Sequence, residues 1–98
     1  MVQTQSHQSL KLELSKMEDG NIIVVLKAHA LTAQRVSYEL RTKGASSTTH
    51  KGVTHLKAND TSTLSSISFS SGEQWCVSLN VEEEGGAKYT INKGNGCS

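Results

Sequence analysis

The chain has 98 residues, of which 35% are hydrophobic and 4% aromatic, with a net charge of +1 and no proline. This length allows one domain with a single thin core and leaves no room for a deep cofactor cleft as well. The small net charge argues against a strong non-specific nucleic-acid binder, because affinity for phosphate needs a concentrated positive field.

Apolar and polar residues alternate along seven short segments, which is the pattern of half-buried strands. The first strand is predicted over residues 10–15 and the second over 21–30, with a turn at Gly20 and Asn21 between them. Five consecutive apolar residues at 22–26 suggest that both faces of the second strand are covered at its start.

The third strand is predicted over residues 35–43, and a glycine–serine connection follows it. Residues 48–56 are polar but rich in β-branched side chains, which is typical of an edge strand that contributes little to the core. The fifth strand is predicted over 64–69, where the odd spacing of the apolar residues indicates a β-bulge. The sixth, over 75–81, has the cleanest alternation, and the seventh, over 87–92, closes the sheet.

Seven strands with regularly spaced turns predict an all-β fold, a seven-stranded immunoglobulin-like β-sandwich over residues 10–92. The immunoglobulin sequence signature is not expected, because the only tryptophan, Trp75, lies on the sixth strand. Residues 1–9 are polar and predict a disordered lead-in, and residues 93–98 form a glycine-rich C-terminal tail. Neither a signal peptide nor a membrane-spanning run is recognisable, so an exported form would have lost its signal.

Two cysteines, Cys76 and Cys97, permit one disulfide. Such a bridge would tie the tail to the sixth strand and contribute about 3 kcal/mol in the chain-entropy model. The alternative is a buried thiol and a free thiol in the tail. Because Cys76 has the opposite parity to Trp75 and Val77, its side chain should point away from the core, which makes a bridge plausible and a reactive site less so.

Signals for catalysis or metal binding are weak. The chain has no Gly-x-Ser-x-Gly nucleophile motif, and no histidine lies in a recognisable frame with a nucleophile. His50 and His55 are five residues apart, which places them on opposite faces of a strand and argues against a shared metal. The acidic run 82–84 is typical of a solvated turn. We therefore expect a protein that is not an enzyme, with no cofactor and no bound metal.

The charges are unevenly distributed, with cations dominating residues 27–57 and acids dominating 60–91. Arg35, Arg41 and Lys43 are separated by even numbers of positions, so their side chains lie on one face of the third strand. If the third and fourth strands are neighbours, this face becomes a shallow site for an anionic partner, acting mainly on encounter rate and orientation. The alternative is an ordinary solvated strand face. The candidate binding residues are Arg35, Arg41, Lys43, His50 and Lys51.

The run at residues 38–52, Tyr-Glu-Leu-Arg-Thr-Lys-Gly-Ala-Ser-Ser-Thr-Thr-His-Lys-Gly, resembles the CsgC/CsgH-type curli chaperones, as do residues 56–59 and 75–81. The resemblance implies a seven-stranded sandwich in the periplasm that keeps the amyloid-forming curli subunit from polymerising before secretion, through transient electrostatic contact. It carries over no catalytic residue. The CsgC branch has a Cys-x-Cys before the third strand, where this chain has Thr32 and Gln34, so the CsgH-like branch is the better match.

The expected partner is therefore an amyloid-forming curli subunit, bound by a monomer that contacts neither nucleic acid nor a membrane. The alternative is a non-catalytic structural or adhesive immunoglobulin-like module of an extracellular assembly, because the fold alone fits many roles.

Overall fold

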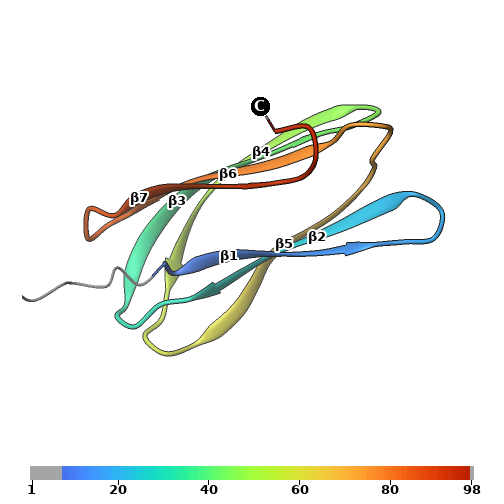
Figure 1. Cartoon of the computed structure of the whole chain (residues 1–98). Coiled ribbons are helices and arrows are strands. Elements are labelled where there is room, and N and C mark those ends of the chain that lie inside the picture. Colours follow the sequence, from blue (N-terminus) through green and yellow to red (C-terminus); the bar gives the residue numbers. More distant parts are fainter. Residues whose placement is uncertain (1–7, 98) are drawn as a thin grey trace, which may run out of the picture.

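The computed structural model describes residues 8–97, which form seven strands and no helix (Figure 1). The strands are β1 (Leu10–Lys16), β2 (Asn21–His29), β3 (Gln34–Lys43), β4 (Ser47–Leu56), β5 (Thr61–Ser70), β6 (Cys76–Glu83) and β7 (Lys88–Lys93). Each falls on one of the seven predicted segments, so the all-β prediction is confirmed. The described residues contain no helix with the length and apolar character needed to cross a membrane.

The strands form two antiparallel sheets, one with the order β1-β2-β5 and one with the order β4-β3-β6-β7. Strand β4 pairs with β3 along its whole length, from the pair Gln34–Leu56 to the pair Lys43–Ser47. It therefore belongs to the four-stranded sheet and forms one of its edges. Most of its residues are exposed, Gly52 and Thr54 are half-buried, and Leu56 enters the core at the end of the strand. The predicted edge strand is confirmed.

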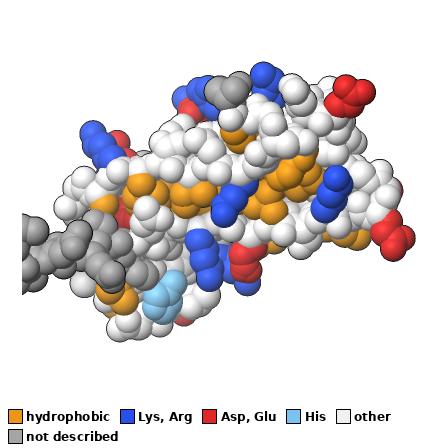
Figure 2. Space-filling view, in the orientation of Figure 1, with side chains coloured by type: hydrophobic (Ala, Val, Ile, Leu, Met, Phe, Trp, Pro, Cys, Tyr) orange, Lys and Arg blue, Asp and Glu red, His pale blue; other side chains and the backbone are white. Residues whose placement is uncertain are grey.

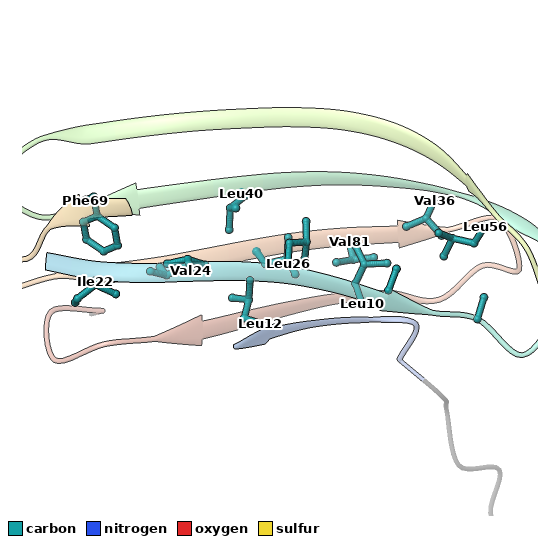
Figure 3. Close-up of a cluster of buried hydrophobic side chains, with 14 residues drawn as sticks. Leu10, Leu12, Ile22, Val24, Leu26, Val36, Leu40, Leu56, Phe69 and Val81 are labelled. Carbon is teal, nitrogen blue, oxygen red and sulfur yellow. The ribbon is translucent and has the colours of Figure 1, made fainter. Parts of the chain in front are cut away.

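The core lies between the two sheets (Figures 2 and 3). It is built from every second residue along the strands, those whose side chains point inward. Strand β2 shows the pattern best, because Ile22, Val24 and Leu26 are buried whereas Ile23 and Val25 are only half-buried. The apolar run at 22–26 is thus fully covered on one face, contrary to the expectation of two. No third layer of the described chain packs on the outer face of this sheet.

A β-bulge interrupts the pairing of β2 with β5. Leu26 lies opposite Ser65 and Lys27 opposite Thr63, so Leu64 has no partner in the ladder. Because of the extra residue, the inward-pointing side chains of β5 are at even positions before the bulge and at odd positions after it. Both Leu64 and Ile67 therefore pack against the core despite their odd spacing. The bulge inferred from that spacing is confirmed.

A buried carboxylate joins the two sheets where β6 ends. Glu83 is 5% exposed and accepts hydrogen bonds from the Ser9 backbone N–H (3.0 Å), the Ser9 hydroxyl (2.9 Å), the Gln34 amide (3.2 Å) and the Tyr89 hydroxyl (2.6 Å). Burial acts to raise the pKa of Glu83, but these hydrogen bonds outweigh it and hold the pKa below its ordinary value. The acidic run is therefore not a uniformly solvated turn.

Ser9 takes part in this cluster and is 3% exposed, although the polar lead-in was predicted to extend to residue 9. Its hydroxyl also lies 3.3 Å from the amide nitrogen of Gln34, at the start of β3. Residues 1–7 of the predicted lead-in lie outside the described residues. Within the described residues, contacts with the second sheet thus include the residue before β1.

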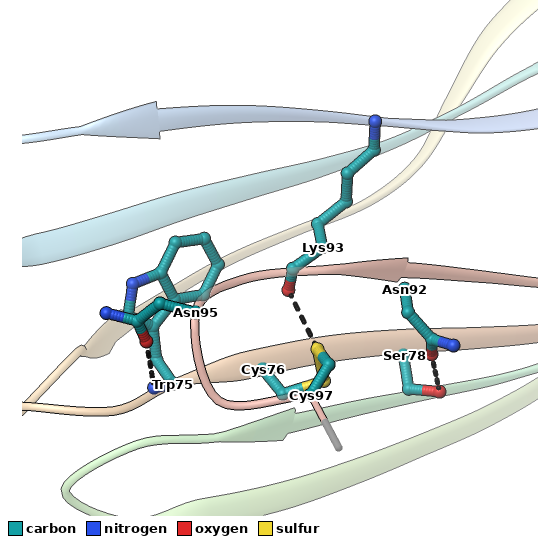
Figure 4. Close-up of a disulfide and its surroundings, with 7 residues drawn as sticks. All are labelled: Trp75, Cys76, Ser78, Asn92, Lys93, Asn95 and Cys97. Atoms are coloured by element: carbon teal, nitrogen blue, oxygen red, sulfur yellow. Dashed lines mark hydrogen bonds between the residues drawn. A yellow bond between two sulfur atoms is a disulfide. The ribbon is translucent and has the colours of Figure 1, made fainter.

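A disulfide joins Cys76 to Cys97, with their Cα atoms 5.0 Å apart (Figure 4). The tail turns back along the start of β6, where the Trp75 N–H donates to the Asn95 side chain (2.9 Å) and the Gly96 N–H donates to the Trp75 carbonyl (2.9 Å). Gly94 makes this turn with φ of 137°, at a point where a Cβ would collide with the Trp75 carbonyl. The bridge therefore closes a loop that is already held by hydrogen bonds.

Candidate functional site

The outer face of the four-stranded sheet carries most of the cations singled out in the sequence. Alternation along β3 buries Val36, Leu40 and Thr42 and turns Arg35, Arg41 and Lys43 to the outside. The register with β4 places Lys51 on the same side, because it lies directly opposite Glu39. We call this surface the basic face, defined by Arg35, Arg41, Lys43, Lys51 and His55.

His50 does not belong to the basic face. It lies opposite Leu40, whose side chain points into the core, so His50 has the inward parity of β4. It remains exposed because β4 is an edge strand. His55 takes its place, since it lies opposite Arg35. The sequence contained this signal, because residues 51 and 55 are four apart and must share a face of a strand.

Glu39 lies at the centre of the basic face and partly neutralises it. Its carboxylate is 2.9 Å from Arg41 Nε and 3.3 Å from Lys51 Nζ. Local desolvation acts to raise the pKa of Glu39, but the hydrogen bonds and charges of Lys51 and Arg41 lower it below its ordinary value. The carboxylate therefore stays ionised at neutral pH. Within residues 8–97, the side chains of Arg35 and Lys43 make no ion pair.

Acidic side chains lie on the same sheet face at the end of β3 that carries Arg35. Glu82 lies next to Ser37 in the β3–β6 ladder, and the Glu84 carboxylate accepts a hydrogen bond from the Arg35 backbone N–H (2.8 Å). A shallow hollow of about 400 Å³ on this face is lined by Ser37, Glu39 and Asn80, among others. The face is thus open, polar and graded in charge, which suits contact with an extended chain better than enclosure of a small molecule.

Chemistry of other kinds finds little support in this geometry. In the part of the chain that the structure describes, no three histidine, cysteine, aspartate or glutamate side chains come together in a way that could hold a metal ion. Both cysteines are consumed by the disulfide. Gln34, one of the two positions aligned with the Cys-x-Cys motif, donates its amide to Glu83.

No protein-family model matches the chain, and no curated protein matches it either. Solved structures do match it, and two of them are described here. The E. coli curli protein CsgC matches with a TM-score of 0.60 at 13% identity, covering 88% of this chain and 95% of that chain. The chain has the CsgC/CsgH-type fold. The solution structure of R. palustris CsgH matches with a TM-score of 0.54 at 17% identity, covering 88% of each chain.

The resemblance drawn from the sequence is confirmed for the CsgC/CsgH-type fold, and at these identities it shows the fold alone. Identity is higher with CsgH and the TM-score is higher with CsgC. The two measures therefore rank the branches in opposite orders, and the CsgH-like assignment stays a prediction. The same holds for the roles of the individual residues on the basic face.

Proposed function

We propose that this protein delays amyloid assembly of a curli subunit through brief, electrostatically guided contact with its basic face. The observation that carries the proposal is the pairing of β4 with β3, which gathers Arg41, Lys43 and Lys51 on one exposed surface. Likeness to the E. coli curli protein CsgC supports the choice of partner. The basic face provides the chemistry, since cations attract an acidic chain over about 8 Å at physiological ionic strength.

The position of the basic face at a sheet edge suits a client that forms amyloid. Amyloid grows when strands add to an exposed edge. Strand β4 is such an edge, and it is exposed along nearly all of its ten residues. An extending client strand could pair with its backbone, while Lys51 and the neighbouring cations discourage the stacking of further strands.

Weak binding is what this role requires. Exposed ion pairs contribute about 0–1 kcal/mol each, so a contact made by a few of them forms quickly and dissociates quickly. One molecule could then meet many growing clients in turn. The protein would act below equimolar amounts and without a catalytic residue.

We place this activity in the periplasm, the compartment that the family resemblance implies. The disulfide between Cys76 and Cys97 supports an oxidising compartment, where such bridges persist. It would not be expected to survive in a reducing cytosol.

The test is fibre formation by a purified curli subunit, followed by the fluorescence of an amyloid-binding dye. A small molar fraction of this protein should lengthen the lag phase, and added salt should shorten it again. An unchanged lag phase at low salt would reject the proposal and leave the structural or adhesive module as the better hypothesis.

A further inference from the structure

The two sheets leave one side of the sandwich open. On that side β1, the edge of one sheet, faces β7, the edge of the other, across the sandwich, and the two strands run in the same direction (Figures 1 and 4). No ladder joins these two strands within the described residues, and a single hydrogen bond links them, from the Leu10 N–H to the Tyr89 hydroxyl (3.1 Å). We call this side the seam. It is defined by Leu12, Leu14 and Lys16 of β1 and by Tyr89, Ile91 and Lys93 of β7.

The seam exposes apolar surface. Leu14, Tyr89 and Ile91 pack against the core but are only half-buried. Figure 2 shows a stripe of hydrophobic side chains along this side, between the two layers, with Lys or Arg side chains lying across it. A contiguous apolar stripe with a polar rim is typical of a docking surface, whereas single exposed apolar residues are not.

The edge of β1 also offers backbone hydrogen-bonding groups. The Leu10 N–H donates to a β7 hydroxyl and so points away from β2, whereas the Met17 N–H donates to the first residue of β2. Because N–H directions alternate along a strand, the N–H groups of Leu12 and Leu14 point the same way as that of Leu10. They meet no acceptor in the described part of the chain. An additional extended segment could pair with them.

Two lysines give the seam a charge at one end. Lys16 and Lys93 follow the apolar positions of β1 and β7, and both are exposed. Neither forms an ion pair within residues 8–97. In Figure 4 the Lys93 side chain extends from β7 towards β1, so its ammonium group lies at the seam. The seam thus combines apolar surface, free strand-edge groups and two lysines without an ion pair in the described chain, of which Lys16 lines a shallow hollow together with Glu18 and Asp19.

We propose that the seam binds an extended segment of a partner protein in which apolar side chains alternate with polar ones and an acidic residue stands at one end. The backbone of the segment pairs with β1, its apolar side chains cover the stripe, and its carboxylate meets Lys16 and Lys93. This surface is separate from the basic face, and binding to it does not require the curli role.

The probe is a short acetylated peptide in which valine and threonine alternate and a glutamate stands two positions beyond the last valine. Amide NMR spectra of the full chain should show shifts at Leu12, Leu14 and Ile91 as the peptide is added. Replacing the glutamate by glutamine, or the protein lysines by Lys16→Gln with Lys93→Gln, should weaken binding by about threefold to tenfold, as expected for two partly exposed ion pairs.

The matched control is Lys11→Gln with Lys88→Gln. It removes the same charge from the same two strands but from their outward-facing positions. Affinity for the peptide should be unchanged in this variant. Equal losses in both double variants, shifts confined to β3 and β4, or no shifts at millimolar peptide would overturn the inference. Shifts of the seam amides with protein concentration alone would also overturn it, because the occupant would then be a second copy.

Discussion

Glu39 lies directly opposite Lys51 across the β3–β4 pair, and the same carboxylate also holds Arg41. One acid thus restrains two of the cations on the basic face. The face therefore attracts an anionic partner chiefly through Lys43, because Arg35 lines a hollow together with Glu82 and Glu84. This relationship decides which substitutions should change binding and in which direction.

Charge reversal on β3 should weaken inhibition without unfolding the protein. Arg41→Glu with Lys43→Glu replaces two exposed cations by anions on a surface that already holds Glu39. The lag phase of a curli subunit should return towards its value without the protein, and the unfolding midpoint should change little, because surface substitutions are usually within about 0.5 kcal/mol. Lys11→Glu with Lys57→Glu is the control. If this control had the same effect on the lag phase, net charge and not the basic face would be responsible.

Removal of the central acid should have the opposite effect. Glu39→Gln releases Arg41 and Lys51 and makes the basic face more positive, so encounter with an acidic client should be faster at low salt. Less protein should then suffice to double the lag phase, and the gain should disappear as salt is added. Glu82→Gln, at the other end of the same sheet face, should give a smaller gain. A Glu39→Gln variant that inhibits less well would contradict the proposed role of the face.

Glu83 should make the fold sensitive to acid. Its pKa lies below the ordinary value in the folded protein, so its contribution to stability is complete above the unfolded pKa, about 4.3. That contribution is lost as pH falls through the lower, folded value. Urea unfolding between about pH 6 and pH 2 should show this loss.

The variant Glu83→Gln should lose about 1–3 kcal/mol at neutral pH, because the amide oxygen replaces a carboxylate that accepts four hydrogen bonds. Its stability should depend less on pH in the acid range than that of the unmodified protein. Glu82→Gln is the control, since Glu82 is exposed and its nearest cation, Lys88, lies 3.9 Å away. Identical acid profiles for the Glu83 variant and the unmodified protein would show that other carboxylates govern the transition.

The disulfide should stabilise the whole domain. Cys76 and Cys97 are 21 positions apart, and the chain-entropy model gives a loop of this size about 3 kcal/mol. Addition of a reductant should lower the free energy of unfolding by about this amount and should increase the solvent exposure of Trp75, which the tail holds by hydrogen bonds. A variant with Cys76→Ser and Cys97→Ser should match the reduced protein and should not respond to reductant.

Gly52 should tolerate no side chain. A Cβ at this position would lie 2.6 Å from the ring of Tyr38, which crosses the edge strand directly opposite the glycine. Gly52→Ala should therefore displace that ring and cost about 1–3 kcal/mol by overpacking. Gly85→Ala is the control, because a Cβ there meets nothing within 4 Å. Equal stability of the two variants would show that the Tyr38 ring moves aside freely.

Local alternation was enough to predict much of this protein. It predicted the seven strands, the exposed edge character of residues 48–56, the bulge near Leu64 and the outward parity of Arg35, Arg41 and Lys43. These features are readable because side-chain direction has a period of two along a strand, so a single segment carries its own inward and outward faces.

Only the tertiary structure decided which strands are neighbours. The pairing of β4 with β3 put His55 beside Arg35 and Lys51 beside Glu39, and it left His50 on the other face. The packing of the two sheets also buried Glu83 among donors from β3, β7 and Ser9. The same packing placed the edge strands β1 and β7 on one side of the sandwich. Periodicity within one segment is the same whichever strand lies next to it, so partner choice and register follow from the joint burial of all seven strands.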